Sequence, residues 1–199
     1  MTYIINHRVN SLNKLQRLPK KFGVEIDVRD YRDKLILNHD PFANGLNFEK
    51  FLNLFKHRFL IVNIKSEGIE RKIIKILKNK KIKNYFFLDS TVPMSLKLEK
   101  SVNKSLRISD LENINLKSIK LNFFNWVWID YINGIYSIKK SQLKCLYKLK
   151  IKNCFVSPEL INNKYSPKIL KTFLDQNKII PDAICTKKPL YWEKIFKNS

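Results

Sequence analysis

The chain has 199 residues, of which 39 are Lys or Arg and 17 are Asp or Glu, so its formal net charge is +22 at pH 7. This length predicts one α/β domain over residues 1–199 and excludes two domains of ordinary size. The basic residues are spread through segments such as IERKIIKILKNKKIKN (69–84), a pattern typical of solvated helix faces. The charge alone therefore does not indicate a nucleic-acid-binding protein, although a positive field would attract an anionic substrate.

The cysteines and the lengths of the apolar runs indicate the cellular compartment in which the protein is expected. Cys145, Cys154 and Cys185 show no CxxC spacing, and an odd number cannot form a complete set of disulfides, so we expect small core residues in a reducing compartment. No run approaches the roughly 18 apolar residues of a membrane span, and MTYIINHRVN (1–10) lacks the apolar stretch of a signal peptide. These features predict a cytoplasmic protein without a transmembrane segment.

Short runs rich in Val, Ile and aromatic residues alternate with amphipathic segments of helical spacing, as in repeated βα units. In chain order, the expected strands are 3–6, 24–28, 34–38, 59–64, 85–89, 105–109, 126–130, 153–157 and 182–186. The expected helices lie near 10–21, 47–57, 69–84, 92–102 and 138–150, with a short helical segment after 105–109. The second and third strands form a hairpin, so eight strand-helix units remain; the residues expected in its solvated turn are Arg29, Asp30, Arg32 and Asp33.

Eight parallel strands buried on both sides predict a compact (β/α)8 barrel, smaller than the typical size of about 250 residues. An open doubly wound sheet is the alternative, but the four glycines form neither GxGxxG nor GxxxxGK. Trp126 and Trp128 share one strand face and are expected to pack in the core, with a substrate-stacking wall as the alternative. His57, in the basic context FKHRF, is expected to be structural or exposed.

Active sites of this fold lie at the carboxyl ends of the strands, so polar residues at those ends are the site candidates. The candidates are His7, Arg8, Glu25, Asp27, His39, Asp40, Asn63, Lys65, Asp89, Arg107, Asp130, Ser157, Glu159, Thr186 and Lys187. Four of them are possible substrate contacts because of their strand-end positions alone: Asp89, Arg107, Asp130 and Glu159.

Glu25 and Asp27 are two residues apart on an expected strand, so both carboxylates lie on the same face. Carboxylates that close repel each other unless a cation or a proton lies between them. Mg²⁺ or Ca²⁺, which prefer oxygen ligands, would remove the repulsion, and Asn63 on the next barrel strand could supply a third oxygen. A surface-facing strand edge of alternating polarity is the alternative interpretation.

Four short motifs follow one another along the chain: HR (7–8), GVEIDV (23–28), HDP (39–41) and IVNIK (61–65). They resemble the motifs of the glycerophosphodiester phosphodiesterases, within the wider superfamily of phosphatidylinositol phospholipase C-like phosphodiesterases. DAICTKKP (182–189) is similar to the final strand of that family. The whole chain resembles a short bacterial subgroup without the family's lid insertion.

The resemblance implies a barrel enzyme that hydrolyses phosphodiesters. It implies that His7 and His39 are the general acid and base and that Arg8 and Lys65 bind the phosphate. The two carboxylates of GVEIDV would be ligands of a divalent cation, with Asn63 at the third ligand position. The expected partner is a small or polymer-linked phosphodiester, and no specific nucleic acid is expected.

Three departures from the family pattern have consequences. Val9 follows HR where the family usually has glycine, which narrows the loop beside the phosphate. Asn63 replaces a carboxylate, so we expect weaker cation binding or a site completed by substrate and water. FANGLNFEKFLNLF (42–55) stands in place of the lid, so we expect an open site that accepts a bulky or polymeric substrate.

Three functions stay open from the sequence. The leading one is a metal-dependent phosphodiester hydrolase, because the family motifs occur in order. The second is a barrel that binds a phosphorylated ligand without turnover, which the Asn63 departure favours. The third is a nucleic-acid-binding module, which rests on charge alone because no recognition motif is present and the aromatic residues lie in strand runs.

Overall fold

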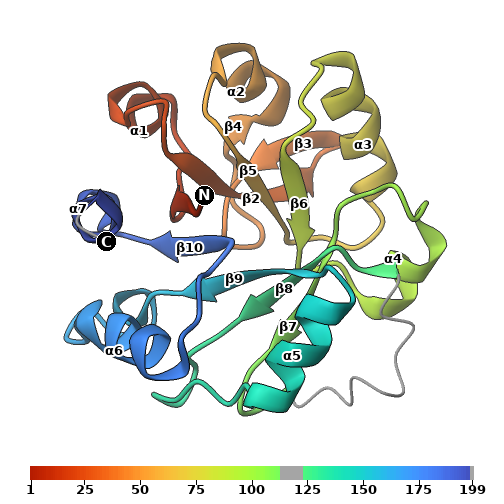
Figure 1. Cartoon of the computed structure of the whole chain (residues 1–199). Coiled ribbons are helices and arrows are strands. Elements are labelled where there is room, and N and C mark those ends of the chain that lie inside the picture. The colour runs from red at the N-terminus through yellow and green to blue at the C-terminus, as the bar shows by residue number, and fades with distance from the viewer. Residues whose placement is uncertain (113–122, 198–199) are drawn as a thin grey trace.

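The computed structural model describes residues 1–112 and 123–197, and its centre is a barrel of parallel strands (Figure 1). The barrel strands are β1 (Tyr3–Asn6), β2 (Gly23–Tyr31), β5 (Leu60–Ile64), β6 (Tyr85–Leu88), β7 (Ser105–Ile108), β8 (Trp126–Ile129), β9 (Lys152–Val156) and β10 (Ala183–Thr186). Their order in space is β7-β8-β9-β10-β1-β2-β5-β6, and a parallel bridge between Phe87 and Lys104 joins β6 to the segment before β7. The predicted (β/α)8 barrel is confirmed.

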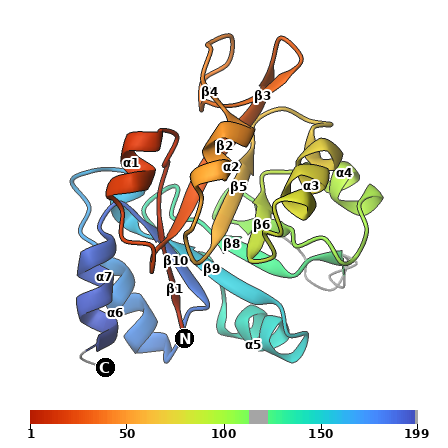
Figure 2. The same cartoon turned by 90° about the horizontal axis from the view of Figure 1, so that it is seen from above.

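Two short antiparallel strands, β3 (Lys34–Leu37) and β4 (Leu46–Asn47), extend from β2 and project beyond the barrel (Figure 2). The hairpin turn consists of Arg32 and Asp33, both in the left-handed backbone region with φ of 46° and 61°. The prediction that Arg29 and Asp30 belong to the turn is wrong, because both lie in β2 and pair with Ile36 and Leu35 of β3.

The helices surround the barrel (Figure 1). They are α1 (Leu12–Arg17), α2 (Phe48–Leu54), α3 (Glu70–Asn79), α4 (Val92–Lys97), α5 (Lys140–Lys148), α6 (Lys168–Asn177) and α7 (Pro189–Lys197), with a 3₁₀ helix, η2 (Pro158–Leu160). Each of α1 to α5 is shorter than the segment that the periodicity predicts, and α6 and α7 complete the strand-helix units of β9 and β10. In α1 the reasons are local: Ser11 caps its start, and Pro19 follows soon after its end. The helical segment expected after 105–109 falls largely outside the described residues.

The lysine-rich helix α3 shows how the basic composition fits the fold. Ile73 and Leu77, one turn apart, are fully buried against the barrel, whereas Lys72, Lys75 and Lys78 are exposed. The predicted solvated lysine face is therefore confirmed for this helix. No helix in the described part of the chain combines the length and apolar character needed to cross a bilayer.

The barrel interior is filled by aromatic and small side chains. Trp126 stacks on Phe86 with ring centroids 4.8 Å apart and meets Phe59 edge-on at 5.3 Å, so its predicted core role is confirmed. Cys154 and Cys185 are buried, free thiols in the same cluster. Because the interior is filled by these side chains, a polar site can form only at the ends of the strands, and in this fold it forms at the carboxyl ends.

His57 has the structural role that was predicted. Both of its ring nitrogens lie 3.0 Å from backbone carbonyls, those of Phe22 and Leu15, and the residue is buried. It therefore connects the segment before β5 to α1 and to the residue that precedes β2.

Candidate active site

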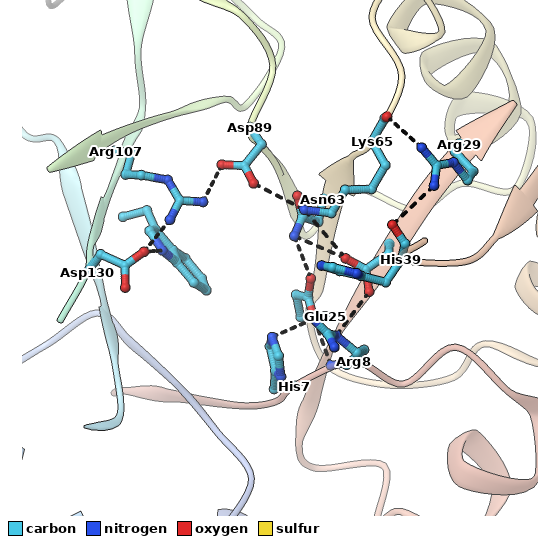
Figure 3. Close-up of polar contacts among 12 residues, drawn as sticks. His7, Arg8, Glu25, Arg29, His39, Asn63, Lys65, Asp89, Arg107 and Asp130 are labelled. Carbon is cyan, nitrogen blue, oxygen red and sulfur yellow. Dashed lines mark hydrogen bonds and ion pairs between the residues drawn. The ribbon is translucent and has the colours of Figure 1, made fainter. Parts of the chain in front are cut away.

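The ends of β1, β2 and β5 bring most of the predicted site residues together (Figure 3). Asp27 and Asn63 are paired in register on adjacent parallel strands. His7 and Arg8 follow β1, and Lys65 follows β5. The interpretation of Glu25 and Asp27 as a surface-facing strand edge is wrong, because the exposed fractions of these residues are 0% and 1%.

The Asn63 side chain lies between the two carboxylates. Its Nδ2 donates to Oε1 of Glu25 over 3.0 Å and to Oδ1 of Asp27 over 3.2 Å. The backbone N–H of Arg8 donates to Oε2 of Glu25 over 2.7 Å. Despite these donors, burial and then the neighbouring Asp27 charge raise the pKa of Glu25 to about 8. Without a bound cation, Glu25 therefore holds a proton at neutral pH.

Two basic side chains stand beside the carboxylates. Lys65 Nζ is 3.7 Å from Asp27 Oδ1, and Arg8 Nε is 3.6 Å from Asp27 Oδ2. The side chain of Arg8 is 47% exposed, so it can turn toward an anion at the barrel mouth. Arg8 and Asp89 both adopt left-handed backbone conformations, with φ of 55° and 61°, which are sparsely populated by residues other than glycine.

His7 lies against Glu25, with Nε2 3.7 Å from Oε2. Burial lowers the pKa of His7 to about 3, with smaller contributions from the charges of Arg8, Lys187, Lys65 and His39. Its Nδ1 is buried and has no hydrogen-bond partner within residues 1–112 and 123–197. At neutral pH this imidazole is uncharged and can accept a proton.

His39 follows β3 and is more exposed, at 40% of its side chain. Its Nδ1 is 2.8 Å from Oδ1 of Asp40. An ionised carboxylate only accepts hydrogen bonds, so Nδ1 carries the hydrogen and Nε2 remains for proton transfer. The charge of His39 lowers the pKa of His7, which places the two rings in one electrostatic environment.

A second cluster lies across the mouth, around Arg107 (Figure 3). Its guanidinium donates to Asp130 through Nη1 and to Asp89 over 2.5 Å through Nη2, and Oδ2 of Asp130 also accepts from Trp128 Nε1 over 3.0 Å. Lys65 Nζ lies 3.4 Å from Asp89 Oδ2 and so joins this cluster to the first one. The ion pairs place three possible substrate contacts in one network, and their contact with substrate stays a prediction.

Glu159, the fourth possible contact, is engaged by the chain itself. One carboxylate oxygen accepts from Thr186 Oγ1 over 2.5 Å and from the backbone N–H of Lys187 over 3.1 Å. The other accepts from Ser157 Oγ over 2.5 Å. The residue is 1% exposed, and its hydrogen bonds fix the start of the loop after β10.

Two residues of this region were missed as site residues. Asn10 holds Asp27 from both sides, because its Nδ2 donates to Asp27 Oδ2 over 2.8 Å and its Oδ1 accepts from the Asp27 backbone over 2.9 Å. Arg29 donates to the carbonyls of His39 over 3.1 Å and Lys65 over 3.3 Å. The alternation of β2 contained a signal for Arg29, since it is two residues beyond Asp27. No comparable signal marks Asn10, whose position depends on the loop conformation.

The side chains of Glu25 and Asp27 on β2 and of Asn63 on β5 carry the oxygen donors that suit a hard divalent cation. The Oδ1 atom of Asn63 is buried and, within the described residues, has no hydrogen-bond partner. A half-turn of the amide would exchange this oxygen for Nδ2 and bring three oxygen donors together. No group of three or more His, Cys, Asp or Glu placed to hold a metal occurs among residues 1–112 and 123–197, so the amide would be the third ligand.

A (β/α)8 barrel with this polar mouth defines the structural class, and comparisons with solved structures refine it. The glycerophosphoryl diester phosphodiesterase of Parabacteroides distasonis matches with a TM-score of 0.70 and 11% identity, over 99% of this chain and 86% of that one. The glycerophosphodiester phosphodiesterase of Thermotoga maritima matches with a TM-score of 0.66 and 16% identity, over 98% of each chain. An Oleispira antarctica phosphodiesterase in complex with the product sn-glycerol-3-phosphate matches with a TM-score of 0.70 and 14% identity, over 98% of this chain and 96% of that one.

No family model matches the sequence, and no curated protein sequence does. The chain therefore has the fold of the glycerophosphodiester phosphodiesterases at low sequence identity. The resemblance in the motifs and the likeness in the structure agree at the level of the fold.

Proposed function

We propose that the protein is a phosphodiester hydrolase whose reaction takes place at the mouth formed by β1, β2, β3 and β5. The observation that carries the proposal is the convergence of His7, Arg8, Lys65 and the Glu25–Asp27 pair on one point of the barrel. A fold alone does not define an activity, and these groups are the ones that phosphodiester hydrolysis requires. The product bound by the Oleispira antarctica neighbour supports a small phosphodiester of glycerol as one substrate.

Arg8 and Lys65 bind the nonbridging oxygens of the phosphate. Arg8 offers a planar fork of donors, and Lys65 offers a point charge that Asp27 and Asp89 hold in place. Negative charge on these oxygens grows as the nucleophile attacks, so fixed positive groups stabilise the transition state more than the bound substrate.

The two histidines divide the proton transfers. His7 is neutral at pH 7 and accepts the proton of the attacking hydroxyl or water. His39, fixed by Asp40 through Nδ1, acts in its imidazolium form, which carries a second proton on Nε2 and gives it to the leaving alcohol oxygen. The attacking group is either water or a neighbouring hydroxyl of the substrate, and the latter gives a cyclic phosphate first.

We also propose that Glu25, Asp27 and Asn63 hold a divalent cation, Mg²⁺ or Ca²⁺. A bound cation would supply charge that stabilises the phosphate oxygens in the transition state. Support comes from the buried, unpaired Oδ1 of Asn63 and from the two carboxylates beside it. Asn10 keeps Asp27 oriented toward this point.

A second candidate function is a barrel that binds a phosphorylated ligand without hydrolysing it. One observation favours it: the amide of Asn63 already satisfies both carboxylates without a cation. In this case Arg8 and Lys65 would still bind phosphate, but the Glu25–Asp27 pair would serve only the structure.

Hydrolysis of bis(4-nitrophenyl) phosphate with Mg²⁺, and with EDTA in its place, separates the two functions. The hydrolase proposal predicts turnover that depends on the cation and falls in His39→Ala. Thermal shift supplies the second arm, because a cation that binds the folded state raises Tm. No turnover, together with stabilisation by inorganic phosphate in EDTA, would support the binding protein.

A further inference from the structure

A cavity of about 500 Å³ opens directly beside the proposed reaction centre. His7 and Arg8 line it, together with residues of α1 and of the loop that follows β10. Its remaining charged lining residues are Lys14, Arg17 and Lys187. The cavity therefore links the proposed phosphate site to a basic face of the molecule.

The charges of this cavity are of one sign. No Asp or Glu side chain is among the described residues that line it. Glu25 and Asp27, which lie next to His7 and Arg8, are buried and do not line the cavity. In the described part of the chain, no carboxylate forms an ion pair with Lys14, Arg17 or Lys187. The Lys187 ammonium instead donates to Oδ1 of Asn163 over 3.1 Å.

The arrangement of these cations suits a compact anion. Lys14 and Arg17 are three residues apart on α1, so their side chains project from the same helix face. Lys187, in the loop that follows β10, also lines the cavity. Leu18 and Leu160 also line the cavity and provide an apolar surface for a short carbon chain.

The number of cations exceeds what the proposed reaction needs. A phosphodiester carries one negative charge, which Arg8 and Lys65 already match. Three further cations without carboxylate partners repel one another, and that repulsion falls when an anion lies among them. A phosphate monoester carries about −1.5 to −2 charges at neutral pH and has oxygens for several donors.

We propose that this cavity binds a second phosphate carried on one alcohol arm of the substrate, so that the preferred substrate is a phosphodiester bearing a further phosphate, as in a short polymer of alcohol phosphates. The inference rests on the proposed hydrolase function for the position of the scissile diester. It assigns Lys14, Arg17 and Lys187 to substrate selection. The proton transfers still belong to the two histidines.

The test compares two substrates that differ only in the second phosphate: glycerophosphoglycerol and its monophosphate. The first is symmetrical, so the comparison does not presuppose which alcohol leaves. We expect kcat/KM to be at least tenfold higher for the monophosphate at low salt, with the ratio falling as ionic strength screens the charges. Lys14→Gln combined with Arg17→Gln should bring the ratio close to one. Lys75→Gln combined with Lys78→Gln, at the same spacing on α3, should leave the ratio unchanged.

Binding to His39→Ala, measured by calorimetry with the same two compounds, provides a readout that does not need turnover. The expected result is tighter binding of the monophosphate, by about tenfold, and loss of that preference when Lys14 and Arg17 are also replaced. Turnover or binding without a preference overturns the inference while the hydrolase function stands. A binding preference without turnover of either compound by the unmodified protein overturns the hydrolase function and leaves the phosphate cavity in place.

Discussion

Asn63 donates its side-chain amide to Glu25 over 3.0 Å, and through this bond a neutral group occupies the place between two buried carboxylates. The same nitrogen is 3.2 Å from Asp27. The amide nitrogen faces the carboxylates in this structure, and under the proposed function the amide would turn its oxygen toward them to hold a cation.

Replacing Asn63 with Asp should strengthen divalent cation binding. A third carboxylate adds a negative oxygen ligand, and ligand charge is a main determinant of affinity for Mg²⁺ and Ca²⁺. We expect the dissociation constant for Mg²⁺, measured by calorimetry at pH 7, to fall by roughly tenfold or more. In EDTA the same variant should be less stable by about 1 kcal/mol or more, because the buried carboxylates lose a donor.

Gln176→Glu, an amide-to-acid change on the exposed surface of α6, is the matched control and should alter neither quantity. Unchanged Mg²⁺ affinity in Asn63→Asp would show that any bound cation lies elsewhere.

The pH dependence of stability should reveal the proton on Glu25. Burial and Asp27 raise the pKa of Glu25 from 4.5 to about 8, so the folded state holds a proton that the unfolded chain releases, and stability falls as pH rises through this window. Burial lowers the pKa of His7 from 6.5 to about 3, so its contribution to stability is fully present above 6.5 and is lost as pH falls toward 3. The two effects oppose each other between pH 4.5 and 6.5, and only the Glu25 effect remains from pH 6.5 to 8.

Urea unfolding in EDTA should therefore show a loss of about 1 to 2 kcal/mol between pH 6.5 and 8. Glu25→Gln, which cannot ionise, should lack this loss. An identical decrease in both proteins would mean that Glu25 is already ionised in the fold at neutral pH.

Arg29 should act as a positioning residue for His39. Its fork joins the His39 carbonyl to the Lys65 carbonyl, and a lysine cannot reach both acceptors in the same way. We expect Arg29→Lys to lower kcat by roughly tenfold to a hundredfold, since small displacements of reacting groups are costly. KM should change little if only the position of His39 is affected.

Arg32→Lys, in the exposed turn of the same hairpin, is the control and should retain full activity. An equal loss in both variants, or a parallel loss of thermal stability, would indicate a general weakening of the hairpin.

Arg107 should contribute mainly to stability. The two carboxylates that it pairs with, Asp89 and Asp130, have side chains that are 24% and 5% exposed. Arg107→Gln would remove the charge partner of Asp130 and leave Asp89 paired with Lys65 alone, and we expect a loss of about 2 to 4 kcal/mol in unfolding free energy. A stable variant with a raised KM would instead support the original prediction of a substrate contact.

Much of the fold could be predicted because the strands carry their own signal. VEIDV, FLIVNI and WVWID are short β-branched or aromatic runs, and strands buried on both sides have this composition. The HR, GVEIDV and HDP motifs located the mouth because the carboxyl ends of parallel strands meet at one end of a barrel.

The remainder depended on tertiary contacts. Arg29 was assigned to the turn because RDYRD is a charged stretch, yet β2 continues past the barrel and carries it to the His39 carbonyl. Glu159 lies beyond the carboxyl end of β9, as expected, but hydrogen bonds from Ser157 and Thr186 occupy its carboxylate. His39 and Thr186, hydrogen-bond partners of Arg29 and Glu159, lie in other segments of the chain, and the alternation of residues along one strand cannot predict them.

The most direct test of the account is phosphorus NMR of glycerophosphoglycerol incubated with the protein and Mg²⁺, which distinguishes diester, cyclic phosphate and monoester in one spectrum. The account predicts monoester, with or without a cyclic intermediate, and a rate lower by at least a hundredfold in His39→Ala. A persistent diester signal with either Mg²⁺ or Ca²⁺, or equal rates for the unmodified protein and His39→Ala, would contradict it.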